Sequence, residues 1–150
     1  MDYAIEVVKL EAARGLALRR TVPMDGLPGF FDEAFTSVGA AAGPAIAGPP
    51  FAQYYSVDPA AVDVEVVFPV AGPVEAPEGM QVLELPRGDA AQVLYTGPYE
   101  GMEPVYRAIE AWRVEHARAA AGPPREIYLT SPADGLPPEE YRTLVVQPLG

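Results

Sequence analysis

The chain has 150 residues, 49% of them hydrophobic, and its 10 Lys and Arg against 21 Asp and Glu give a net charge of −11. This length and composition suit a single domain over residues 1–150 with a sizeable core. The negative charge argues against direct binding to nucleic acid or an anionic membrane, and the lack of cysteine excludes disulfides and thiolate metal sites.

The first half of the chain is predicted to place its elements in the order strand, strand, helix, strand, strand. The four segments that favour strands are Tyr3–Leu10, Leu16–Val22, Phe51–Ser56 and Val62–Phe68. Apolar residues with helical spacing begin near Leu27 and end at Val38. The next segment, Gly39–Pro50, is rich in Ala, Gly and Pro, so a loop is predicted there.

The second half repeats this order. Its strand segments are Met80–Leu85, Ala90–Tyr95, Arg125–Thr130 and Tyr141–Val146. A helix is predicted from Met102, because apolar residues follow at positions 105, 106, 109 and 112. If the first two strands of a half form a hairpin, each half is a β-β-α-β-β unit.

The halves, about residues 1–75 and 76–150, resemble copies of one unit. At a spacing of 75 positions, Thr21, Pro23 and Gly26 match Thr96, Pro98 and Gly101, and at a spacing of 74, Gly48–Pro50 and Tyr54 match Gly122–Pro124 and Tyr128. The matches keep one order, which favours a duplication over chance alignment of Pro and Gly. We therefore predict an α+β fold with duplicated halves about a pseudo-twofold axis, an antiparallel sheet with the helices on one face, and a central pocket between the halves.

One strand of the second half is predicted to bring a carboxylate to this pocket. Alternation points Ile127 toward the helices and places Glu126 and Tyr128 on the opposite face. In the first half Ala52 matches Glu126 and Tyr54 matches Tyr128, so the duplicated site has two phenols and one acid. The alternative is that Glu126 is a solvated residue on an open sheet face.

Aromatic residues are the other candidates for the pocket. We expect ligand contacts from Tyr54, Tyr95, Tyr99, Tyr128, Tyr141 and Trp112. A tyrosine combines an apolar ring with a polar tip, and a cation over such a ring gains roughly 0.5 to 2 kcal/mol. Core packing is the alternative for each of them, and the expected core aromatics are Phe30, Phe35, Phe68, Tyr106 and again Trp112.

Other chemistry finds little support in the sequence. His116 is the only histidine, so it cannot build a metal cluster. A Ser-His-acid triad would depend on His116 alone and is not expected, and we expect a solvated residue that caps a helix end. No Gly-rich phosphate loop follows a strand. We therefore predict no metal and no cofactor. A cytoplasmic location is predicted because the first residues contain neither a basic segment nor a long apolar run.

Taken together, these segments resemble the GyrI-like (gyrase-inhibitor-like) effector-binding domain of multidrug-sensing transcription activators. The matching segments are Gly48–Tyr55, Val62–Val70, Leu85–Gly88, Thr96–Glu100, Glu126–Leu129 and Thr143–Pro148. The resemblance implies the SOUL/GyrI-like fold and a pocket in which a glutamate among aromatic rings receives lipophilic cations. Glu126 matches that glutamate, and Tyr141 matches a further pocket aromatic less closely. A helix-turn-helix segment is missing from these 150 residues, so the resemblance implies a stand-alone member.

Three functions follow from the residues and the resemblance. We expect a binding protein for amphipathic, often cationic, aromatic compounds rather than an enzyme. A hydrolase of cyclopropane-type genotoxins that uses Glu126, and an inhibitor that contacts gyrase through an acidic surface, stay open as alternatives. The expected partners are a small molecule and, for the last alternative, gyrase or a regulator. The chain is expected to be a monomer or a weak dimer.

Overall fold

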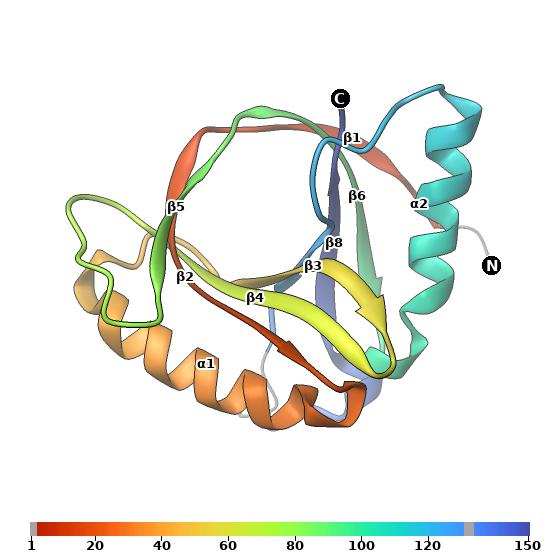
Figure 1. The fold of residues 1–150 in the computed structure, drawn as a ribbon. Coiled ribbons are helices and arrows are strands. Elements are labelled where there is room, and N and C mark those ends of the chain that lie inside the picture. The colour runs from red at the N-terminus through yellow and green to blue at the C-terminus, as the bar shows by residue number, and fades with distance from the viewer. Residues whose placement is uncertain (1–2, 131–133) are drawn as a thin grey trace. The chain divides into compact units, whose positions relative to one another are not determined.

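The computed structural model describes residues 3–130 and 134–150. The chain divides into two compact units, which we call the N-terminal unit, Glu11–Arg87, and the C-terminal unit, Gly88–Gly150 together with Met1–Leu10. Each unit contains antiparallel strands and an α-helix, so the predicted α+β class is confirmed (Figure 1). Within the described residues, neither α-helix is long and apolar enough to cross a membrane.

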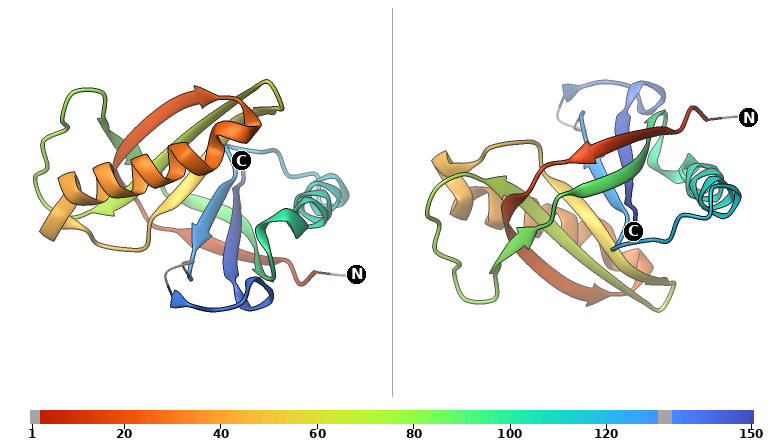
Figure 2. Two further views of the ribbon diagram at one scale, coloured as in Figure 1. Left: turned by 90° about the horizontal axis from the view of Figure 1, so that it is seen from below. Right: turned by 90° about the horizontal axis from the view of Figure 1, so that it is seen from above.

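The N-terminal unit is a four-stranded antiparallel sheet with one helix on it. Its strands are β2 (Ala13–Val22), β3 (Phe51–Asp58), β4 (Ala61–Val70) and β5 (Gln81–Leu85), paired in the order β3-β4-β2-β5. Helix α1 (Leu27–Ala42) lies against β2 and β4 (Figures 1 and 2). Phe30, Ala34 and Val38 recur every four residues and are buried, so the predicted helical stripe forms this part of the core.

The prediction of a loop from Gly39 onward is wrong in its first residues, because α1 continues to Ala42. Alanine is the strongest helix former, and three alanines follow Gly39. Gly39 itself serves packing, since a Cβ at this position would lie 3.2 Å from Cζ of Phe68. The helix ends where Gly43 takes a φ of 51°, a conformation that glycine adopts without steric cost.

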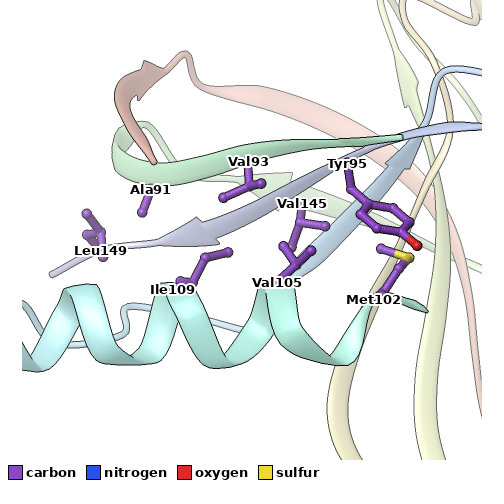
Figure 3. Packing of buried hydrophobic residues seen from close by; sticks show 8 residues of the cluster. All are labelled: Ala91, Val93, Tyr95, Met102, Val105, Ile109, Val145 and Leu149. Atoms are coloured by element: carbon purple, nitrogen blue, oxygen red, sulfur yellow. The ribbon is translucent and has the colours of Figure 1, made fainter. Parts of the chain in front are cut away.

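The C-terminal unit repeats this plan. Its strands are β1 (Glu6–Leu10), β6 (Gly88–Thr96), β7 (Arg125–Tyr128) and β8 (Arg142–Pro148), paired antiparallel in the order β1-β6-β8-β7. Helix α2 (Glu103–Glu115) packs on one face of these strands. Figure 3 shows Val105 and Ile109 of α2 directed toward Val93 of β6 and Val145 of β8, which form the core of the unit.

The hairpin alternative for the first two strands of each half is wrong. Strand β1 pairs with β6 of the second half, and β5 pairs with β2 of the first half. Each compact unit therefore contains the first strand of the other sequence half. The links Glu11–Ala12 and Pro86–Arg87 disfavour the hairpin, because a two-residue hairpin turn needs positive φ and thus favours Gly, Asn or Asp.

Candidate functional site

Glu126 lies on the face of the C-terminal sheet that α2 covers. Its cross-strand neighbour on β8 is Val145, which belongs to the hydrophobic core beneath α2 (Figure 3). Directly opposed residues of antiparallel strands point to the same side of a sheet. The predicted alternation along β7 is therefore retained, but the predicted face is wrong. Polarity alone had assigned Glu126 to the face away from the helices.

Two phenols hold the Glu126 carboxylate. The hydroxyl of Tyr128, two residues along β7, donates to Oε1 at 2.8 Å, and the hydroxyl of Tyr106 on α2 donates to Oε2. All three side chains are half-buried. A hydrogen bond to a charged acceptor contributes about 1.5–3 kcal/mol, so the phenols fix the carboxylate in place. Being neutral donors, they do not cancel its charge.

Further tyrosine rings lie next to Tyr128, one of the two phenols that hold this carboxylate. The ring of Tyr128 meets that of Tyr99 edge-on at 5.8 Å, and Tyr99 stacks on Tyr141 at 5.2 Å. Partial burial raises the pKa of Tyr99, with smaller contributions from Tyr141 and Glu126. Because 38% of Tyr99 is still exposed, the stack reaches the surface. We call Tyr99, Tyr106, Glu126, Tyr128 and Tyr141 the Glu126 cluster.

A buried hydroxyl lies on the same face. Thr143 of β8 is opposite Tyr128 on one side and Tyr95 on the other, and its side chain is fully buried. Among residues 3–130 and 134–150, its Oγ1 has no hydrogen-bond partner. An unsatisfied buried hydroxyl costs about 1–3 kcal/mol. Thr143 thus adds an unused polar atom beside the Glu126 cluster.

A pocket of about 340 Å³ opens along α2, and Tyr106 forms part of its wall. The wall also includes the charged residues Glu103, Arg107 and Glu110 and the amide of Gln147. This volume lies in the range of small-molecule sites, roughly 300–1,000 Å³. Tyr106 thus belongs both to the pocket wall and to the Glu126 cluster, although Glu126 itself does not line the pocket.

The other predicted ligand residues lie elsewhere. Tyr95 is buried in the core of Figure 3, and its hydroxyl donates to the carbonyl of Pro98 at 2.8 Å. Trp112 packs against the same core and stacks on His116, the predicted cap at the end of α2, at 4.3 Å. Tyr54 is half-buried on β3 in the N-terminal unit.

The structure thus brings together four of the predicted residues: Tyr99, Glu126, Tyr128 and Tyr141. Sequence reasoning assigned Tyr106 to the core alone and missed its contact with Glu126. The signal was its position at the edge of the helical stripe, where a tyrosine can bury its ring and still present its hydroxyl. In the described parts of the chain, no three His, Asp or Glu residues gather as metal ligands.

Comparison with models of protein families assigns the chain to a family. The model of the GyrI-like small-molecule-binding domain matches residues 3–149. The chain belongs to this family. The resemblance drawn from the sequence is confirmed, and the GyrI-like domain extends over both compact units. Among curated proteins, no sequence matches the chain.

Solved structures share the fold at low sequence identity. The C-terminal domain of EcmrR has a TM-score of 0.88 at 18% identity, with 100% of this chain and 99% of that chain covered. A hydrolase from Listeria innocua has a TM-score of 0.72 at 12% identity, covering 99% and 93%. SAV2435 bound to tetraphenylphosphonium has a TM-score of 0.65 at 14% identity, covering 100% and 94%. At these identities the likeness shows the fold.

Proposed function

We propose that this GyrI-like domain binds an amphipathic aromatic cation at the Glu126 cluster. One observation carries the proposal. The carboxylate of Glu126 is held by two phenols, Tyr106 and Tyr128, and the ring of Tyr128 contacts a stack of two further tyrosine rings, those of Tyr99 and Tyr141. The carboxylate attracts positive charge, and the faces of the rings attract both cations and flat apolar groups.

The charge is expected to determine the choice of ligand. At 4 Å and an effective permittivity near 20, a cation gains about 4 kcal/mol from one carboxylate before desolvation is subtracted. A neutral ligand of the same shape lacks this attraction. Part of the gain is spent on the lost freedom of the ligand, so a dissociation constant in the micromolar range or weaker is expected.

The comparisons support this ligand class. The family is described as binding small molecules. One structural neighbour, SAV2435, is described as bound to tetraphenylphosphonium, an aromatic cation. The same class suits a half-buried carboxylate beside stacked tyrosines in this chain.

A thermal-shift titration with tetraphenylphosphonium tests the proposal. The wild-type protein should be stabilised by roughly 2.7 kcal/mol at a ligand concentration 100 times the dissociation constant. Glu126→Gln should weaken binding at least about tenfold, since it removes the charge but keeps the shape. Glu115→Gln, an equal charge change at the exposed end of α2, is the matched control and should bind like wild type. Equal binding by the wild type and Glu126→Gln would reject the proposal.

A hydrolase is the second candidate, because Glu126 is a half-buried carboxylate beside phenols and two neighbours from Listeria innocua are described as hydrolases. Glu126 would act as the general base that takes a proton from an attacking water. Turnover of a strained cyclopropane compound, abolished by Glu126→Gln without loss of aromatic-ligand binding, would favour this activity. No turnover by the wild type would exclude it for that substrate.

Gyrase inhibition stays a prediction from the acidic composition and the resemblance. A supercoiling assay with gyrase decides it. Unchanged supercoiling at saturating protein would count against this alternative.

A further inference from the structure

A second carboxylate is enclosed by hydrogen-bond donors in the N-terminal unit. Glu65 of β4 is 0% exposed. Its Oε1 accepts from Nε2 of Gln53 at 2.7 Å and from the hydroxyl of Tyr55 at 2.6 Å, and its Oε2 accepts from Nε2 of Gln81 at 3.2 Å. These donors come from β3 and from the first residue of β5. All three are neutral, so they satisfy the oxygens without balancing the charge.

A guanidinium group lies over this arrangement. The central carbon of the Arg19 guanidinium is 3.6 Å from the centroid of the Tyr55 ring. Its Nε and Nη2 donate to the two carboxylate oxygens of Asp63 at 2.9 and 2.7 Å. Arg19 is also the cross-strand neighbour of Glu65, so both side chains are on one face of the sheet.

Each contact suits a planar cation. The ring of Tyr55 offers a stacking face, and Asp63 offers two acceptors to the two-pronged edge of a guanidinium. Glu65, hydrogen-bonded to the Tyr55 hydroxyl, adds negative charge at the hydroxyl end of the phenol. Burial and the hydrogen bond to Glu65 raise the pKa of Tyr55 to about 12, so the phenol stays neutral and continues to donate.

We propose that Tyr55, Asp63 and Glu65 form a second cation site, selective for a guanidinium group, which the chain fills with its own Arg19. The site would take a free alkylguanidinium if the Arg19 side chain were removed. In the native chain Arg19 excludes free cations from it. This site uses no residue of the Glu126 cluster and goes beyond the proposed function.

The neighbouring residue Arg20 also contacts an aromatic ring and a carboxylate, but at an exposed position. Its guanidinium lies 5.4 Å from the centroid of the Phe30 ring and pairs with Glu33 of α1. The Glu33 side chain is 53% exposed, whereas Glu65 is fully buried. Phe30 has no hydroxyl to link its ring to a buried carboxylate. Arg20 is therefore the matched control for Arg19.

Chemical rescue tests the proposal. Arg19→Ala should unfold at a lower temperature than wild type, and ethylguanidinium should raise this temperature by about 3–6 °C at ten times its dissociation constant. Ethylammonium lacks the planar fork, so it should act at least about tenfold more weakly. Arg20→Ala should respond to ethylguanidinium no more than wild type. An equal response of Arg19→Ala, Arg20→Ala and wild type would overturn the proposal.

Two double variants show which residues the rescue depends on. Arg19→Ala combined with Tyr55→Leu removes the stacking face and should lose the rescue. Arg19→Ala combined with Glu126→Gln should keep it, so failure of the Glu126 proposal and failure of this one are distinguishable. If Arg19→Ala is unfolded without ligand, recovery of its circular dichroism signal by ethylguanidinium becomes the readout. No recovery would then overturn the proposal.

Discussion

Glu126 and Glu65 both lie on strands, and each accepts a hydrogen bond from a tyrosine. Their surroundings differ. Glu65 is fully buried and takes donors from Gln53, Tyr55 and Gln81. Glu126 is half-buried and is held by two phenols next to a partly exposed ring stack. This difference in burial fits the proposed roles, in which Glu65 supports the fold and Glu126 binds the ligand.

The largest expected difference between the two glutamates is the loss of stability when each is replaced by alanine. Glu65→Ala leaves the buried amide of Gln53 without its acceptor, which costs about 1–3 kcal/mol, whereas the exposed residues Tyr55 and Gln81 can turn to water. We expect a loss of about 1–3 kcal/mol in the free energy of unfolding. Glu126→Ala should cost less, since Glu126 itself is half-buried and neither of its donors is on a fully buried residue. Urea unfolding measures both, and equal losses would contradict the assignment of roles.

The hydrogen bond between Tyr55 and Glu65 should also make the stability of the protein depend on pH above pH 9. The pKa of Tyr55 is raised from 10 to about 12 by burial and by its hydrogen bond to Glu65, so the folded state favours the neutral phenol. This contribution to stability is complete below pH 10 and is lost as the pH rises toward 12. Wild type should therefore lose more stability than Tyr55→Phe between pH 9 and 11. Parallel losses in the two proteins, measured by urea unfolding, would refute this pH dependence.

The smallest expected effect concerns the ring stack. Tyr141→Leu removes the outer partner of Tyr99, and an aromatic pair contributes about 0.5–1.5 kcal/mol. Affinity for tetraphenylphosphonium should fall about two- to tenfold. Tyr55→Phe, in the other unit, should leave this affinity unchanged. Isothermal titration calorimetry measures the affinity of both variants. A larger loss of affinity in Tyr55→Phe than in Tyr141→Leu would show that the ring stack does not bind the ligand.

Much of the fold was predictable because the signals are local. The spacing of Val105 and Ile109 predicted α2, and alternation together with the resemblance singled out Glu126. The exchange of β1 and β5 depends on pairing between distant segments, which periodicity does not encode. The face of Glu126 was mispredicted for the same reason, since only its register with Val145 fixes it.

The Glu65 group shows this limit more clearly. A glutamate between valines in a buried strand was a visible signal, and sequence analysis left it unused. Its partners Gln53 and Arg19 lie on strands on either side of β4, and only the register of three strands brings them together. The roles of such residues follow from non-local pairing rather than from any motif.

Discrimination between a cation and a neutral ligand of the same shape tests the role of the Glu126 carboxylate most directly. Methyltriphenylphosphonium and triphenylphosphine oxide have nearly the same shape, and only the first carries a net positive charge. Calorimetry should show that wild type prefers the cation at least about tenfold and that Glu126→Gln largely loses this preference. A preference that survives in Glu126→Gln, or that is missing in wild type, would contradict the role of this carboxylate.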